Sequence, residues 1–203
     1  MFKKFILKYF IYVSLFSIIY GNDDQELALD YFMQGQFLLN QGKYAMAVIE
    51  FQDAILLDPN AITIHISLAD AYGRIGKVER ALDHLQIALD INPDDLEAMQ
   101  MLGKLYLAEN SIEKAEKVFL RLNKLDPENL DHLYVLADIS KVKRKWSDAI
   151  DYYLIIYDQN PDITGVLQQA LQLSLTINDL TRSDEICELM LKNDPMNLDI
   201  LET

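Results

Sequence analysis

The stretch LLDPN, residues 56–60, places a proline directly behind an apolar run in a chain whose pattern is otherwise that of helices. Proline inside a helix costs about 3 kcal/mol, because it removes a backbone hydrogen bond and its ring clashes with the preceding turn. The chain has five prolines, and each lies 34 residues after the one before it: Pro59, Pro93, Pro127, Pro161 and Pro195. This spacing indicates a repeated unit in which proline marks a fixed position.

Five windows of 34 residues align without gaps: residues 28–61, 62–95, 96–129, 130–163 and 164–197. The residue before each proline is always Asp or Asn. Position 20 is always small, namely Ala47, Ala81, Ala115, Ala149 and Ser183. Position 8 is small in the first four windows, and position 24 is large in the same four: Phe51, Leu85, Phe119 and Tyr153. The small residues at positions 8 and 20 predict close helix–helix contacts, and the large residue at position 24 is expected to fill the space beside them.

Each window holds two apolar-periodic stretches of about a dozen residues, which predicts two amphipathic helices. Position 15, between them, is Gly42, Gly76, Asn110, Arg144 or Asn178. Gly and Asn tolerate the left-handed conformation that ends a helix, so only Arg144 departs from the pattern. The second helix is expected to end at the Asx–Pro pair, whose Asx side chain can cap N–H groups of the next turn. Because one hairpin cannot bury its apolar face alone, neighbouring hairpins are expected to stack.

These columns resemble the tetratricopeptide repeat family: small at position 8, Leu or aromatic at position 11 (Leu38, Tyr72, Tyr106), Ala at 20, large at 24 and Pro at 32. The resemblance covers residues 28–197. It is strong in the first three windows and weaker in the last two, where position 11 is Ser140 and Ser174. It implies an all-α fold, a right-handed α-solenoid of helix-turn-helix repeats. An irregular helical bundle would not be expected to keep this period five times.

The N-terminus differs in composition from the rest of the chain. Lys3, Lys4 and Lys8 precede twelve uncharged, mostly apolar residues, 9–20, and a polar lead follows at residues 22–27. This order is typical of a secretory signal peptide, and twelve residues are fewer than the ~20 that span a bilayer. Residues 1–21 are therefore expected to be a cleaved signal peptide or an uncleaved membrane anchor. The protein would be periplasmic or secreted in the first case, and membrane-anchored facing the periplasm in the second.

The net charge of −14 disfavours nucleic acid and anionic membrane surfaces as partners. The single cysteine, Cys187, excludes an intrachain disulfide, and its place at position 24 favours a buried thiol over a nucleophile. The three histidines, His65, His84 and His132, fall at positions 4, 23 and 3 without ligand spacing, and are expected to be partly exposed on helices. No catalytic constellation, metal site or cofactor site is expected, and the protein is not expected to be an enzyme.

In the family, positions 2, 5, 9 and 12 of each first helix line a concave groove. The resemblance therefore implies a protein-binding surface that includes Leu29, Phe32, Gln36, Ile66, Asp70, Gln100, Lys104, Tyr134 and Asp138. Leu29 and Phe32 could instead pack against the residues that follow the signal. Family members that grip a terminal carboxylate need Lys, Asn and Arg at defined positions, where this chain has Phe32, Gln36, Ser67, Glu97 and Met101. A co-chaperone of that type is therefore not expected.

Two further features suggest contacts. The stretch KVKRKW, residues 141–146, is a basic turn that could meet an acidic partner or lipid headgroups, or simply be solvated. The fifth window has an apolar first helix with Leu171, Leu173 and Leu175, and the tail 198–203 is too short for a polar capping helix. We therefore expect the fifth repeat to be covered by a partner or by a second copy of the chain.

Together these features predict an exported, non-enzymatic scaffold of a bacterial envelope that binds a protein or peptide segment through its concave face. The first alternative is a membrane-tethered assembly factor or an accessory subunit of an envelope complex, held by an uncleaved N-terminal segment. A second alternative, an enzyme accessory or cryptic enzyme, would require a histidine or carboxylate cluster to form on folding.

Overall fold

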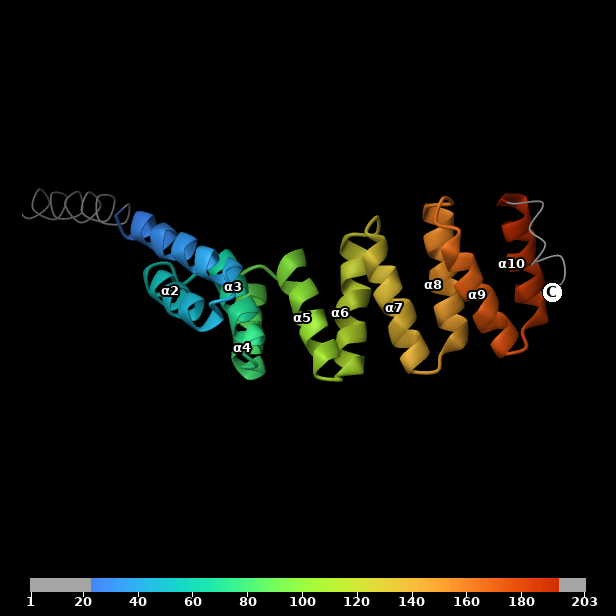
Figure 1. Cartoon of the computed structure of the whole chain (residues 1–203), viewed down its shortest axis with the longest axis horizontal. Coiled ribbons are helices and arrows are strands. Elements are labelled where there is room, and N and C mark those ends of the chain that lie inside the picture. The colour runs from blue at the N-terminus through green and yellow to red at the C-terminus, as the bar shows by residue number, and fades with distance from the viewer. Residues whose placement is uncertain (1–22, 194–203) are drawn as a thin grey trace, which may run out of the picture. The chain divides into compact units, whose positions relative to one another are not determined.

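A computed structural model describes residues 23–193, and every regular element in that range is an α-helix. The expected signal or anchor at 1–21 and the tail at 198–203 lie outside the described residues. The helices, coloured along the chain in Figure 1, are residues 23–40, α2 (Tyr44–Leu57), α3 (Ile62–Arg74), α4 (Val78–Ile91), α5 (Leu96–Ala108), α6 (Ile112–Leu125), α7 (Leu130–Val142), α8 (Trp146–Gln159), α9 (Gly165–Thr176) and α10 (Leu180–Asn193). The predicted all-α helical-repeat fold is confirmed.

The turn inside each hairpin has the same backbone geometry in every repeat. Its central residue has a positive φ: 74° at Gly42, 76° at Gly76, 56° at Asn110, 58° at Arg144 and 56° at Asn178. The next residue donates its N–H to a carbonyl five residues earlier at 2.8–2.9 Å, as from Lys43 to Leu38 and from Lys145 to Ser140. This hydrogen bond satisfies a carbonyl that the end of the first helix leaves without a partner.

Arg144 adopts the left-handed conformation although its side chain is not suited to it. An L-residue with a Cβ atom pays roughly 1–2 kcal/mol there, and glycine does not. The Arg144 side chain is exposed. We therefore expect Arg144→Gly to raise the free energy of unfolding by about 1 kcal/mol, as measured by urea denaturation.

Arg144→Ala is the matched control, because it removes the charge but keeps the Cβ atom. It should leave the free energy of unfolding near or below that of the wild type. Equal stabilisation by the Ala and Gly variants would show that charge, and not the backbone conformation, sets the cost at this turn.

The Asx–Pro pair ends the second helix of each of the first four repeats. The backbone N–H of Asp58, Asn92, Asp126 or Asn160 makes the last helical hydrogen bond, to the carbonyl four residues earlier. The side-chain oxygens of Asn92 and Asn160 then accept the N–H of the residue after the proline, at 3.3 and 3.2 Å. The capping role expected for the Asx side chain is therefore present at both asparagines. At all four joints the backbone carbonyl of the Asx residue also accepts the N–H three residues later, as from Ala61 to Asp58 at 3.3 Å.

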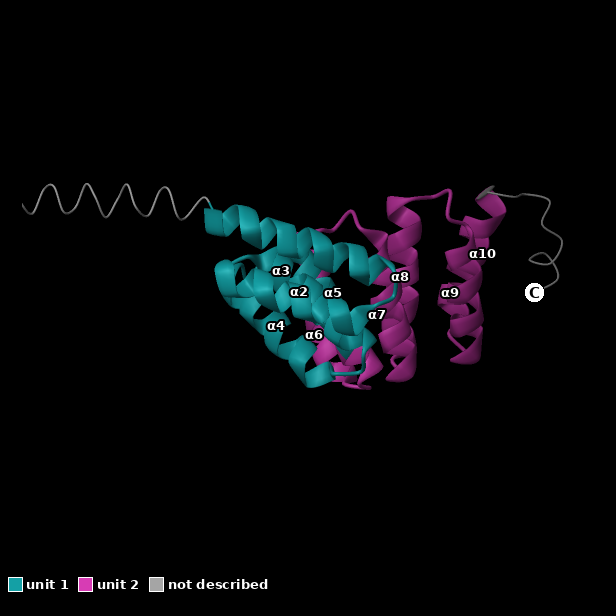
Figure 2. Cartoon of the chain, turned by 60° about the vertical axis from the view of Figure 1, so that its left-hand side comes forward, with its two compact units in different colours: residues 1–105 teal, residues 106–203 magenta. Residues whose placement is uncertain are grey.

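The chain divides into two compact units, residues 1–105 and residues 106–203 (Figure 2). In the first unit, α3 packs against both α2 and α4. The small residue at position 8 meets the large residue at position 24, as predicted: a Cβ atom placed on Gly35 would lie 2.5 Å from two ring carbons of Phe51. The Phe51 ring is itself fully buried and lies 5.8 Å from the ring of Phe32. The first hairpin is therefore closed by an aromatic ring pressed against a glycine.

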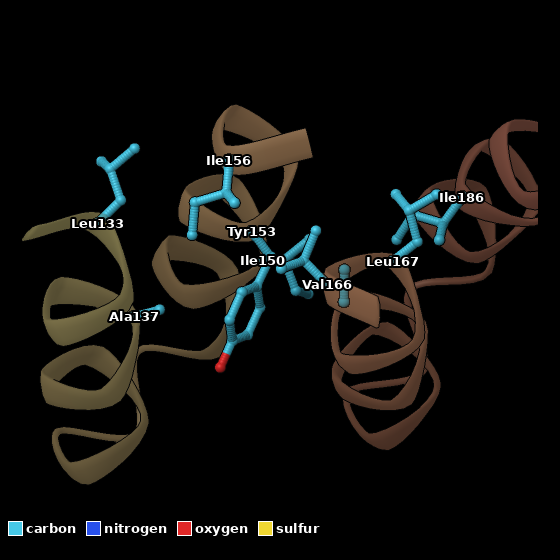
Figure 3. Close-up of a cluster of buried hydrophobic side chains, with 9 residues drawn as sticks. Leu133, Ala137, Ile150, Tyr153, Ile156, Val166, Leu167 and Ile186 are labelled. Atoms are coloured by element: carbon cyan, nitrogen blue, oxygen red, sulfur yellow. The ribbon is translucent and has the colours of Figure 1, made fainter. Parts of the chain in front are cut away.

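In the second unit, α7, α8, α9 and α10 share one core. Its nine buried residues, all but one labelled in Figure 3, come from all four helices: Leu133, Ala137, Ile150, Tyr153, Ile156, Val166, Leu167, Ala170 and Ile186. Leu171 and Leu173 pack against this cluster, and of the three leucines predicted to make the fifth repeat apolar only Leu175 is exposed, at 43%. Most of the apolar surface expected on the fifth repeat is therefore used inside the unit.

Gly35→Ala should destabilise the first unit by about 1–3 kcal/mol, because the new methyl group overlaps the buried Phe51 ring. Urea denaturation followed by circular dichroism measures this change.

Gly73→Ala is the matched control, since a Cβ at Gly73 in α3 meets nothing within 4 Å. Removing a helical glycine there should stabilise the protein by up to about 1 kcal/mol. A Gly35→Ala variant as stable as Gly73→Ala would contradict the close approach of Gly35 and Phe51.

Candidate functional site

The first-helix surface of the first unit contains a pocket beside the N-terminal end of the described chain. Its volume is about 270 Å³, and its lining is Gln25, Ala28, Leu29, Phe32, Asp58, Ala61, Thr63 and Ile64. Two of the residues predicted for the groove, Leu29 and Phe32, therefore line a real depression. Leu29 is 54% exposed, whereas Phe32 is half-buried because its ring rests on Phe51.

The predicted groove residues further along the first unit differ in accessibility. Gln36 is half-buried and donates its side-chain N–H to Ser67 Oγ at 2.7 Å, which links the first two repeats. Asp70 forms an ion pair with Arg74 at 3.1 Å. The expectation that Ile66 lines an exposed groove is wrong, because its side chain is 4% exposed and packs inside the unit. Gln100 is half-buried and Lys104 is exposed on α5.

Tyr134 and Asp138 belong to the second unit, on α7. Asp138 is exposed and bonds to Lys141 Nζ at 2.6 Å, and Lys141 Nζ also donates to Tyr153 Oη at 3.0 Å. Tyr134 is half-buried, and burial together with the neighbouring Tyr153 raises the pKa of its hydroxyl. This surface is polar and internally paired, so it offers hydrogen-bonding groups.

Two histidines that the sequence left on separate helices meet in the structure. His65 Nδ1 lies 3.0 Å from His84 Nδ1. His65 Nε2 lies 3.0 Å from the carbonyl oxygen of Pro59, in the LLDPN stretch at residues 56–60. Tyr72 stacks on His84, with ring centroids 5.6 Å apart, and its hydroxyl accepts from Gln52 Nε2 at 2.9 Å. The expected partial exposure is wrong for His65 and His132, which are 4% and 2% exposed, and holds for His84.

The carbonyl of Pro59 fixes the proton positions in this pair. A carbonyl only accepts, so His65 Nε2 carries a proton, and neutral His65 presents Nδ1 as an acceptor for the Nδ1–H of His84. If both rings were charged, two N–H groups would face each other. Positions 4 and 23 lie on the two helices of one hairpin, so the repeat alignment contains the signal for this contact, which a search for single-helix spacing misses.

Burial, and secondarily the neighbouring His65, lowers the pKa of His84. The unfolded chain then binds a proton more readily than the folded chain, so the contribution of His84 to stability is present above a pH of about 6.5 and is lost as the pH falls below it. We expect the free energy of unfolding to fall between pH 7 and pH 5 in urea denaturation experiments.

His84→Asn is the control for this pH dependence. The Asn amide can donate to His65 Nδ1 as His84 Nδ1 does, but it does not titrate. The variant should lose part of the decrease in stability between pH 7 and pH 5. Parallel wild-type and variant curves across that range would show that His84 titrates alike in the folded and unfolded chains.

No group of three or more His, Cys, Asp or Glu side chains suited to a metal ion is present within residues 23–193. Cys187 is half-buried, and burial raises the pKa of its thiol. The basic turn is largely paired: Lys143 and Lys145 both contact Glu116, and Lys145 also contacts Asp148 at 3.6 Å. Within the described helices, none is long and apolar enough to cross a membrane.

Comparison with known proteins agrees with these repeats. Tetratricopeptide repeat family models match residues 31–61 and residues 76–139. A tetratricopeptide repeat and J domain-containing co-chaperone from Cryptococcus neoformans is 23% identical over 181 residues. Lipopolysaccharide assembly protein B from Escherichia coli is 27% identical over 134 residues. The matches cover 84% and 64% of this chain, but only 35% and 34% of these two relatives, so the chain spans about a third of their length.

Solved structures resemble the whole fold at low identity. YrrB, described as a TPR protein with an unusual peptide-binding site, is 15% identical with a TM-score of 0.65, over 89% of this chain and 93% of its own. The MamA protein is 18% identical with a TM-score of 0.69, over 84% and 93%. The first TPR of Spaghetti (RPAP3), bound to an HSP90 peptide, is 26% identical with a TM-score of 0.56, over 59% and 95%. Together with the repeated hairpins, the two family matches show tetratricopeptide repeats at residues 31–61 and 76–139.

Proposed function

We propose that the protein is a scaffold that binds an extended or helical segment of another protein on the first-helix surface of its first unit. The pocket lined by Leu29, Phe32 and their neighbours is the observation that carries this proposal. Tetratricopeptide repeat proteins act as protein-interaction scaffolds, and the Spaghetti repeat domain is a relative with a bound peptide.

The chemistry of the pocket suits one apolar side chain of a peptide. Ala28, Leu29, Phe32, Ala61 and Ile64 supply apolar surface, and burial of such surface is the main favourable term in recognition. Polar groups lie beside it on Gln25, Asp58 and Thr63, where they can pair with the backbone of the bound segment. An apolar depression with a few polar groups is the usual arrangement for peptide recognition by helical grooves.

Binding of the chaperone-tail type is not part of the proposal, although one relative is a co-chaperone. The positions that would hold a terminal carboxylate carry no Lys or Arg, and Glu97 has the wrong charge. Phe32 and Gln36 are instead engaged with Phe51 and Ser67. We also propose that the scaffold is not an enzyme, because the facing histidines are tied to each other and to a backbone carbonyl.

Export to a bacterial envelope is the second element of the proposal. The order of basic, apolar and polar residues at the N-terminus supports it. The membrane-tethered assembly factor uses the same surface with an uncleaved segment, and a relative named for lipopolysaccharide assembly fits that alternative. An intact mass measured on protein from cells separates them, because cleavage after Gly21 removes 21 residues.

Site-specific photocrosslinking in cells tests the pocket. A photoreactive phenylalanine analogue at Leu29 should give a discrete adduct with a partner protein. Thr63→Arg adds a long side chain at the exposed edge of the pocket, so it should reduce the yield at least tenfold without unfolding the protein.

The control places the same analogue at Leu180, which is 60% exposed on α10 and belongs to the second unit. It should give no adduct of that mass. The pocket is not the binding site if the adduct forms equally from Leu180, or if Thr63→Arg leaves the Leu29 adduct unchanged.

A further inference from the structure

The outward side of the second helices changes character in the first repeat. Positions 19, 22 and 29 are charged in each of the other four repeats: Arg80, Asp83 and Asp90; Lys114, Lys117 and Lys124; Asp148, Asp151 and Asp158; Arg182, Glu185 and Lys192. In the first repeat the same positions are Met46, Ile49 and Leu56, exposed by 53%, 58% and 78%. Large apolar side chains that cluster on an exposed surface usually mark an interaction site, so we expect this face of α2 to contact a partner.

The first helix adds to this surface. Met33 and Phe37, at positions 6 and 10, are 60% and 58% exposed. Their equivalents in the second repeat, Ser67 and Ala71, are 8% and 0% exposed. Phe37 and Met46 stand on either side of the turn at residues 41–43, which joins the two helices.

We call Met33, Phe37, Met46, Ile49 and Leu56 the outer face of the first repeat. A half-exposed side chain of this size shows roughly 100 Å² to solvent, so the five present about 500 Å² of apolar surface. A standard interface buries about 800 Å² per partner, a little over half of it apolar. The outer face therefore has the apolar area of one side of a stable dimer.

We propose that the outer face of the first repeat is a self-association surface that pairs with the same face of a second copy of the chain. Positions 6 and 10 are buried within the stack in the second repeat, so the outer face is suited to meeting another helical hairpin. A second first repeat supplies such a hairpin with the same apolar residues, and a twofold arrangement lets each copy bury the face of the other. This places self-association at the first repeat, where the sequence pattern had suggested the fifth.

Charge distinguishes a second copy from other occupants. Asp30 and Glu50 lie beside the outer face and Asp53 lies between Ile49 and Leu56, which disfavours an anionic membrane surface. Two copies repel through these carboxylates and attract through apolar surface, so added salt should strengthen their association. A basic occupant, such as residues 1–8 with their three lysines, would instead be released by salt.

Co-capture of two full-length copies that carry different C-terminal tags, expressed in the same cells, tests the proposal. We expect one tag to retain the other copy, and the retained fraction to hold or rise between 50 and 500 mM salt. The variant Met46→Arg, Ile49→Asp, Leu56→Asp gives the first repeat the residues of the second, and should lower co-capture at least tenfold. Ile87→Asp, at an exposed apolar position on α4, is the control and should not.

Disulfide formation gives an independent readout, because it does not depend on whether the triple variant folds. In a Cys187→Ser background, Ile49→Cys should form a disulfide-linked dimer of twice the monomer mass under oxidation, whereas Asp83→Cys, at the same position of the second repeat, should stay monomeric. The proposal is overturned by absence of co-capture, by co-capture that survives the triple variant or falls with salt, or by equal dimer yields from both cysteines.

Discussion

Contact between successive hairpins is the constraint on which the rest of this structure depends. A two-helix hairpin has too little interior to bury its own apolar face, so its stability comes from the neighbours on each side. The second unit shows this directly, because Tyr153 and Ile156 of α8 lie in one buried cluster with Leu133 of α7 and Leu167 of α9. The small residues at positions 8 and 20 allow these helices to approach, and the large residue at position 24 fills the space between them.

Most of the fold follows from the sequence because this packing needs the same residue types at the same positions. The prolines, the Asx before them and the residue at the hairpin turn predict where the helices end, and the described helices up to α9 end there. The fifth repeat shows how a departure is accommodated. Ser174 stands at position 11, where the first three repeats have Leu or Tyr, and Ser183 takes the place of Ala at position 20. Their hydroxyls hydrogen-bond to each other at 2.8 Å while fully or almost fully buried. One departure therefore compensates the other.

The candidate site was less predictable because accessibility depends on contacts that do not repeat. Family position places Ile66 in a groove, but its side chain is only 4% exposed. The contact between His65 and His84 does not follow from residue spacing along one helix, because a hairpin brings residues of two helices together. Leu29 and Phe32, which family position also assigns to the groove, line a pocket, and their role in binding stays a prediction.

Function in such a chain must come from residues that the repeat does not need. The histidine contact at the carbonyl of Pro59 is one case, since it attaches a titratable pair to one of the five otherwise equivalent joints. The first repeat is another, because it combines an apolar pocket at its first helix with exposed apolar residues at positions that are charged in every other repeat. Packing between hairpins explains neither feature. The exposed apolar side chains of the first repeat are costly in water unless something covers them, so the first repeat is where this scaffold has surface left for binding.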